Sequence, residues 1–287
     1  MLHPIALPID SYLPQITKSW ESAGIAAIII KATPGSGKTT RVPWHLSKKT
    51  PQKILVLEPR RLAAKLAAGR VAQENGLQLG KEVGYVFRYE SQISEQTRLI
   101  FLTEGTFLRQ MLSNPQLEGI STVVLDEFHE RHLETDGALA LIRCLQKGPR
   151  PDLKLVIMSA TLETRPLEDY LGQFQTVEIK NTLFPLTLNY LPHRPEELNL
   201  PLEKKVYQAM AKCWEEDGDI LVFLPGMREI RRVQEHLGEF ASFSLILHGD
   251  LSSQEQSRVL SPSDQRKIIL STNIAESSVT IPGIQIV

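Results

Sequence analysis

Strand-like apolar runs alternate with helical patterns along the first part of the chain, beginning with IAAIII at 25–30. Strands that alternate with helices of this length predict βαβ units and a parallel sheet covered on both faces. The expected strands are 25–30, 53–59, 83–87, 97–103, 121–126 and 153–161, and the expected helices are 61–73, 104–112 and 134–146.

The pattern changes near residue 175. The stretch 177–203 is interrupted by four prolines, which predicts a linker with one edge strand. Beyond it the alternation resumes, so we expect an α/β protein with two domains, 1–178 and 179–287. The expected elements of the second domain are helices near 202–216, 227–237 and 252–260 and strands at 219–226, 243–248 and 266–272.

Composition fits this organisation and sets limits on it. A chain of 287 residues with 42% hydrophobic content is long enough for about two domains, each with a sizeable core. The longest apolar runs are far shorter than the roughly 20 residues of a membrane span. The N-terminus MLHPIALPID lacks the basic and then apolar layout of a signal peptide, so we expect a cytoplasmic protein.

Cysteine usage and net charge narrow the possible partners. Cys144 and Cys213 share no metal-ligand spacing, and both are expected to be isolated thiols packed in the core. The formal net charge of −1 argues against a globally basic nucleic-acid binder. Any contact with RNA or DNA must therefore come from local placement of hydrogen-bond donors.

The segment KATPGSGKTT (31–40) follows the first apolar run and opens a helical pattern. Its glycine-bearing turn can wrap phosphates with backbone N–H groups at a helix N-terminus, while Lys38 reaches the terminal phosphates and Thr39 holds Mg²⁺. The usual phosphate-loop pattern begins with glycine, and here that position is Ala32. The alternative is a chance glycine-rich turn with a solvated lysine. The residues expected to bind the nucleotide are Pro34, Gly35, Ser36, Gly37, Lys38, Thr39 and Thr40.

A second motif, LDEFHER (125–131), lies at the end of the expected strand 121–126. Asp126 is expected to position the same metal ion, and Glu127 to orient the attacking water. Alone, the acidic pair could be a solvated helix start with favourable dipole contacts. Together the two motifs predict an ATP-hydrolysing motor with ATP and Mg²⁺ as cofactors.

Nine blocks in family order resemble the DEAH-box ATP-dependent helicases of superfamily 2, specifically the bacterial HrpB branch. This resemblance implies two RecA-like domains with parallel sheets, ATP in the cleft between them, and single-stranded nucleic acid, RNA above all, across the top. The blocks are ATPGSGKTTRVP (32–43), LEPRRLAAKLAAGRVA (57–72), VGYVFRYE (83–90), TEGTFLRQML (103–112), LDEFHER (125–131), MSATLE (158–163), ILVFLPG (220–226), LHGDLSSQEQSRVL (247–260) and STNIAESSVTIPGI (271–284).

The resemblance also implies a nucleic-acid face. The residues of this face follow the ends of strands, where guanidinium groups, hydroxyls and backbone N–H groups can contact a sugar-phosphate backbone. Each block alone has an alternative: solvated arginines, an ordinary helix cap by Thr103, or a polar turn after the strand 266–272. The residues implied are Arg60, Arg61, Thr103, Gly105, Thr272 and Asn273.

Further roles follow from the same resemblance. Ser159 and Thr161 couple nucleotide state to domain movement, although simple loop hydrogen bonding is the alternative. His129 links the water-positioning site to the second domain. Arg70 stacks on adenine, opposite a position that is Leu260 here instead of an aromatic ring. Base selectivity is therefore expected to be loose.

An arginine-rich block is expected after the strand that begins at Ile284, but the sequence stops at Val287. We therefore expect a C-terminally truncated helicase with an incomplete second domain, which binds ATP and hydrolyses it slowly. Two alternatives stay open. One is a phosphate-loop enzyme acting on small molecules, and the other is a fragment that binds nucleotide and nucleic acid without efficient turnover. The sequence leaves the choice between RNA and DNA open.

Overall fold

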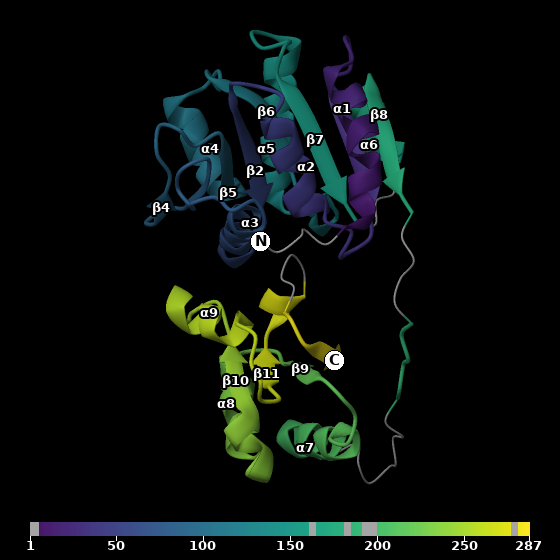
Figure 1. Cartoon of the computed structure of the whole chain (residues 1–287), viewed down its shortest axis with the longest axis vertical. Coiled ribbons are helices and arrows are strands. Elements are labelled where there is room, and N and C mark those ends of the chain that lie inside the picture. Colours follow the sequence, from purple (N-terminus) through teal and green to yellow (C-terminus); the bar gives the residue numbers. More distant parts are fainter. Residues whose placement is uncertain (1–5, 161–164, 181–184, 191–199, 277–280) are drawn as a thin grey trace. The chain divides into compact units, whose positions relative to one another are not determined.

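The computed structural model describes residues 6–160, 165–180, 185–190, 200–276 and 281–287 (Figure 1). The chain forms two compact units, Met1–Leu183 and Phe184–Val287. Each unit is α/β and has its own sheet, as expected. The predicted domain boundary after residue 178 lies within the last strand of the first sheet, Phe174–Ile179.

The first unit contains an eight-stranded sheet with the order β4-β3-β5-β2-β6-β7-β1-β8. All its pairings are parallel except that between β3 and β4, a short antiparallel strand that the sequence did not predict. The strand β8 lies at the edge of the sheet and overlaps only the first residues of the stretch 177–203, in which an edge strand was expected. The strands are β1 (Ala27–Ala32), β2 (Lys53–Glu58), β3 (Val83–Val86), β4 (Ser91–Gln92), β5 (Leu99–Thr103), β6 (Ile120–Leu125), β7 (Lys154–Ser159) and β8 (Phe174–Ile179).

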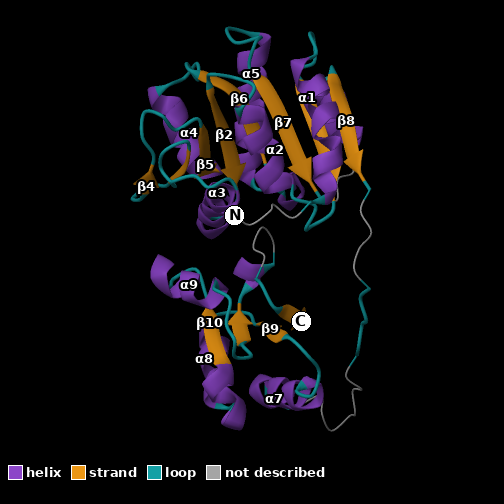
Figure 2. Cartoon of the chain, viewed as in Figure 1, coloured by secondary structure: helices purple, strands orange, loops and turns teal. Residues whose placement is uncertain are grey.

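Helices cover both faces of this sheet (Figure 2). Successive side chains of a strand point to opposite faces, and both faces are buried here: Ile28 and Ile30 join one core, while Ala27 and Ile29 join the other. This explains why the strands are continuous apolar runs. The first core is shared with α1 (Leu13–Glu21), α2 (Lys38–Ser47) and α3 (Arg61–Glu74), and the second with α4 (Glu104–Ser113), α5 (Leu133–Lys147) and α6 (Arg165–Leu171).

The N-terminal segment was not predicted as structured, yet it packs against the first core. A 3-10 turn, η1 (Pro8–Tyr12), leads into α1, and Ile9 and Ile16 are fully buried. The backbone N–H of Ile9 donates to the carbonyl of Ser36 at 3.2 Å. The start of the chain is therefore joined to the segment that follows β1.

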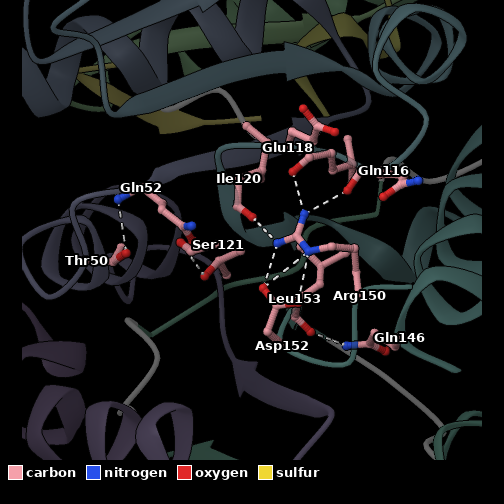
Figure 3. A network of polar contacts seen from close by, with 12 residues as sticks. Thr50, Gln52, Gln116, Glu118, Ile120, Ser121, Gln146, Arg150, Asp152 and Leu153 are labelled. Carbon is pink, nitrogen blue, oxygen red and sulfur yellow. Dashed lines mark hydrogen bonds and ion pairs between the residues drawn. The ribbon is translucent and has the colours of Figure 1, made fainter. Parts of the chain in front are cut away.

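The amino-terminal edge of the sheet is held together by Arg150, which precedes β7 (Figure 3). Its Nη1 donates to the carbonyls of Gln116 (2.7 Å) and Leu117 (2.6 Å), and its Nη2 donates to the carbonyl of Ile120 at 2.8 Å. Asp152 pairs with the same guanidinium at 2.8 Å. Arg150 therefore joins the turn before β6 to the turn before β7.

The two cysteines differ in exposure. Cys213 is half-buried at the end of α7, and its Sγ lies 3.6 Å from the carbonyl of Met210. Cys144 was expected in the core, and this expectation is wrong because its side chain is exposed. The inward face of α5 is formed by Ala138, Ile142 and neighbouring apolar residues, and Cys144 lies outside that set.

The second unit contains a four-stranded parallel sheet with the order β10-β11-β9-β12. Its core joins α7 and α8 to β9 and β11. No helix in the described ranges of either unit is long and apolar enough to cross a membrane. The elements are α7 (Leu202–Cys213), β9 (Asp219–Phe223), α8 (Met227–Glu235), η3 (Gly238–Phe243), β10 (Ser244–Leu247), α9 (Ser253–Leu260), β11 (Ile268–Ser271), η4 (Asn273–Ala275) and β12 (Ile284–Ile286).

Candidate nucleotide and nucleic-acid site

The candidate residues of the first unit follow the carboxyl ends of its parallel strands. In a parallel sheet these ends meet along one edge, which is where α/β proteins bind ligands. The segment 31–40 follows β1, the arginine pair follows β2, Thr103 ends β5, Asp126 follows β6, and Ser159 ends β7. The topology therefore brings together motifs that are far apart in the sequence.

The turn after β1 has the backbone shape of a phosphate cradle. Gly35 and Gly37 have φ of 76° and 91°, a left-handed region in which glycine is favoured. A Cβ at Gly37 would also lie 2.6 Å from Cδ1 of Leu7, so a side chain there would require Leu7 to move. Because α2 begins at Lys38, its first N–H groups face this turn. The Oγ of Ser36 is buried and has no hydrogen-bond partner among the described residues.

Lys38 and Glu127 form a buried ion pair, with Nζ and Oε1 3.0 Å apart. They are 5% and 7% exposed. Burial alone would lower the pKa of Lys38, but the carboxylates of Asp126 and Glu127 outweigh it and raise that pKa. Lys38 is therefore a fixed cation at the mouth of the phosphate turn.

Thr39 and Asp126 form the second link between the two motifs. Their Oγ1 and Oδ2 atoms are 2.5 Å apart, and Oδ1 of Asp126 accepts the backbone N–H of Glu127 at 2.8 Å. The described residues contain no group of three or more histidine, cysteine or acidic side chains able to hold a metal ion. Mg²⁺ fits the pair, because it usually takes one or two protein ligands and completes its shell with phosphates and water.

Glu127 has an unusual backbone and an unusual charge state. Its φ of 47° lies in the left-handed region, which a non-glycine residue rarely adopts. Burial, followed by the charge of Asp126, raises its pKa to about 7. Nδ1 of His129 lies 3.4 Å from its Oε2, and burial beside Lys38 lowers the pKa of this histidine, which favours neutral imidazole. Glu127 can thus accept a proton near neutral pH.

Glu58 is a member of this cluster that sequence reasoning missed. It ends β2 and is fully buried, and its carboxyl group can share a hydrogen bond with Asp126 when one of the two is protonated. Burial and the charges of Asp126 and Glu127 raise its pKa well above the usual range, which favours the neutral acid. The available signal was an acidic residue at the end of an apolar strand, in LEPRR.

The residues proposed for nucleic-acid contact differ in how they are held. Nη2 of Arg60 lies 3.1 Å from Oε2 of Glu130, while Arg61 begins α3 and is exposed. Thr103 occupies the N-cap position of α4, but its hydroxyl meets Oγ1 of Thr106 at 2.9 Å instead of a backbone N–H. Gly105 is exposed, and a Cβ there would meet no atom within 4 Å. Packing therefore leaves the backbone of α4 open to close approach.

The remaining candidates are distributed over both units. Ser159 is fully buried, its Oγ has no partner among the described residues, and Thr161 lies outside them. Nε of Arg70 meets Glu74 at 2.5 Å, and the Arg70 side chain is 58% exposed. In the second unit, Thr272 is buried just after β11 and Asn273 is exposed, while Leu260 is buried at the end of α9.

Family models cover most of the chain. The model described as DEAD/DEAH box helicase matches residues 14–170, and the helicase conserved C-terminal domain matches residues 203–287. These matches fall on the two compact units separately.

Individual relatives agree with this assignment. The chain is 39% identical to the ATP-dependent RNA helicase HrpB of Escherichia coli over 98% of its own length and 35% of that protein. It is 38% identical to the human probable ATP-dependent RNA helicase DHX34 over 98% of its length and 26% of that protein. The chain thus spans about a quarter to a third of these relatives.

Solved structures give the same result. The crystal structure of the Escherichia coli DEAH/RHA helicase HrpB matches with a TM-score of 0.85 and 40% identity, covering 97% of this chain and 36% of that one. A structure of the E. coli DExH-box NTPase HrpB matches with a TM-score of 0.77 and 38% identity, covering 99% of this chain and 36% of that one. From the matched family model and these relatives, the chain belongs to the DEAD/DEAH box helicase family.

Proposed function

We propose that this chain binds ATP with Mg²⁺ at the carboxyl edge of its first sheet, hydrolyses it, and couples hydrolysis to movement on or unwinding of RNA. The observation that carries the proposal is the pairing of Lys38 with Glu127 and of Thr39 with Asp126, across more than 80 residues of sequence. Relatives named as ATP-dependent RNA helicases support the choice of RNA. A cytoplasmic location stays a prediction of the sequence.

In this proposal the phosphate turn and Lys38 bind and orient the nucleotide. Backbone N–H groups of residues 35–40 surround the phosphates, with Pro34 shaping the start of the turn, and the Lys38 ammonium leaves Glu127 to neutralise the terminal phosphate. Thr39 and Asp126 hold Mg²⁺, which when bound neutralises charge on the phosphate oxygens. Arg70 lies on α3, where its exposed guanidinium can stack on a base.

Glu127 acts as the proton acceptor for the attacking water. Its raised pKa suits this role, because a base is most effective when its pKa is near the working pH. Once Lys38 turns to the phosphate, the Glu127 carboxylate is released toward the water. His129 lies beside the second carboxylate oxygen and orients it. Ser159 and Thr161 are proposed to couple this site to movement.

The nucleic-acid face follows the adjoining strand ends. Arg60 and Arg61 contact phosphates, and Thr103 and Gly105 contact the backbone of the strand beside them. Thr272 and Asn273 are proposed to make the equivalent contacts from the second unit. These contacts carry no base specificity, so binding is expected to tolerate many sequences.

The test of the ATPase is Glu127→Gln. The amide preserves the shape of the side chain but cannot accept the proton, so we expect ATP affinity to be kept and turnover to fall by about a hundredfold or more. ATP binding and single-turnover hydrolysis are measured on the same preparation. The matched control is Glu134→Gln, which changes an exposed acid at the start of α5 and should leave turnover unchanged. Comparable turnover in both variants contradicts the role of Glu127.

The test of the nucleic-acid face is Arg61→Gln. Loss of one phosphate contact should weaken single-stranded RNA binding similarly for different sequences and reduce the salt slope by about 1. Arg98→Gln, which changes an exposed arginine at the amino end of β5, is the control. Loss confined to one RNA sequence, or a parallel loss of ATP affinity, would mean that Arg61 is on a different face.

A further inference from the structure

The turn that follows Asp126 is bracketed by two residues in left-handed backbone conformations. Glu127 has φ of 47° and Arg131 has φ of 54°, and the 3-10 turn η2 (Phe128–Glu130) lies between them. Such conformations cost roughly 1 kcal/mol or more each in a non-glycine residue. The backbone N–H of Glu130 donates to the carbonyl of Glu127 at 2.9 Å. A displacement of Glu130 therefore acts directly on the backbone of Glu127.

The side chain of Glu130 reaches across to the neighbouring strand end. Its Oε2 lies 3.1 Å from Nη2 of Arg60, and the two side chains are 14% and 20% exposed. Arg60 is the N-cap residue of α3, whose first turn contains no acidic residue of its own. Glu130 thus supplies a carboxylate to a helix start that favours anions.

A second set of contacts fixes Glu130 from the other side. Nε2 of His132 lies 3.5 Å from Oε2 of Glu130, and its Nδ1 lies 3.9 Å from Oε1 of Glu104. The hydroxyl of Thr135 donates to the same oxygen of Glu104 at 2.7 Å. Glu130 is therefore connected to the starts of α4 and α5 as well as to Arg60.

We propose that Glu130 is a positioning residue that competes with the phosphates of bound nucleic acid for Arg60, and so links nucleic-acid binding to the backbone of Glu127. The inference rests on the proposed function, which places Arg60 on the nucleic-acid face. A phosphate that approaches Arg60 meets the negative charge of Glu130 and must replace it as the partner of the guanidinium. Glu130 then moves, and with it the turn that holds Glu127.

The experiment measures binding of a fluorescein-labelled oligouridylate to the full chain by anisotropy, at low salt and without nucleotide. Glu130→Gln removes the competing charge and keeps the size of the side chain. We expect it to bind RNA about two- to fivefold more tightly than the unchanged protein, the range for a partly exposed ion pair. Glu134→Gln removes an exposed charge at the start of α5, and it should change affinity less.

A double-mutant cycle separates competition for Arg60 from general repulsion. In an Arg60→Gln background the tightening caused by Glu130→Gln should disappear, because the shared partner is absent. Tightening that persists in this background overturns the inference, as does equal or weaker RNA binding by Glu130→Gln alone. If Glu130→Gln does not fold, Glu130→Asp withdraws the carboxylate from Arg60 and should shift affinity in the same direction.

A second readout addresses the link to Glu127. Addition of Mg²⁺ with a non-hydrolysable ATP analogue is expected to shift RNA affinity less in Glu130→Gln than in the unchanged protein, and an equal shift contradicts the link. If the unchanged protein does not bind RNA at all, the proposed function fails and the inference fails with it. If it binds RNA and Glu130→Gln behaves like Glu134→Gln, only the inference fails.

Discussion

In the first sheet, the amino-terminal ends and the carboxyl-terminal ends of the strands hold polar groups in opposite ways. At the amino-terminal edge, Arg150 donates to three backbone carbonyls and pairs with Asp152. At the carboxyl edge, Lys38 shares a buried space with Asp126, Glu127 and Glu58. Buried oxygens of Ser36 and Ser159 at the carboxyl edge have no protein partner among the described residues.

This difference separates stabilising polar groups from functional ones. A buried polar group normally has a hydrogen-bond partner, and an exception calls for an explanation. The Arg150 network needs none, because its donors and acceptors match. At the carboxyl edge, acidic groups outnumber cations, two buried hydroxyls lack a partner among the described residues, and the backbone of Glu127 is in the left-handed region. Such features cluster at sites where a ligand binds. Substitutions at the two edges should therefore have opposite effects on activity and stability.

The largest expected effect is on activity, from Lys38→Ala. Without the ammonium group, charge that develops on the terminal phosphate is not neutralised, and ATP turnover should fall by about a hundredfold or more. The fold should survive, because Glu127, whose pKa is raised to about 7, can take up a proton when its partner is gone. Turnover is measured by phosphate release and folding by circular dichroism. Hydrolysis retained in a folded variant would count against the whole site.

The next effect is on stability, from Arg150→Met. The side chain length is kept, but the carbonyls of Gln116, Leu117 and Ile120 lose their donors. We expect a loss of about 2–3 kcal/mol in the free energy of unfolding, with ATP affinity unchanged in the folded fraction. Urea unfolding checks this against Arg109→Met, an exposed control on α4. A loss of ATP affinity without a loss of stability would contradict the conclusion that Arg150 stabilises the fold and does not serve the nucleotide site.

The smallest effect concerns Glu104, at the start of α4. Burial raises the pKa of this carboxyl above its ordinary value. Folding therefore favours the protonated acid, and stability is lost as the pH rises above the unfolded pKa. Glu104→Gln removes this cost and can still accept the hydroxyl of Thr135, so it should be more stable at neutral pH by about 1 kcal/mol or less.

The pH dependence of that gain is the critical measurement. Thermal unfolding should show the advantage of Glu104→Gln at neutral pH and its disappearance below about pH 3, where the acid is protonated in both states. Glu95→Gln, which changes an exposed acid outside α4 and α5, is the control. A gain that does not vary with pH would show that charge burial is not its cause.

Much of the fold could be predicted because its signals are local. The alternation of apolar runs and helical patterns predicted the elements closely, as for α3, expected at 61–73 and found at Arg61–Glu74. The segment η1 and α1 was missed because its prolines resemble a loop and its buried apolar positions are few. The strand β4 was missed because Ser91 and Gln92 are polar and exposed.

The sequence motifs predicted most residues of the candidate site, but they did not predict which of these residues contact one another. The sequence indicated Lys38 and Glu127 separately, but their ion pair depends on β1 and β6 both flanking β7, which no local pattern encodes. Glu58 was missed for the same reason, since it reaches the acidic pair only because β2 pairs with β6. The ion pair between Glu130 and Arg60 also depends on the pairing of β2 with β6.

The position of β1 in the sheet has a consequence for how the protein folds. Its two neighbours are β7 and β8, so the strand that carries the phosphate turn pairs only with the last two strands of its unit. Contacts over such sequence separations form slowly, and a chain emerging from the ribosome must wait for them. The nucleotide site therefore assembles only when the first unit has been synthesised almost completely, and ATP binding by a nascent chain would report that the unit has folded.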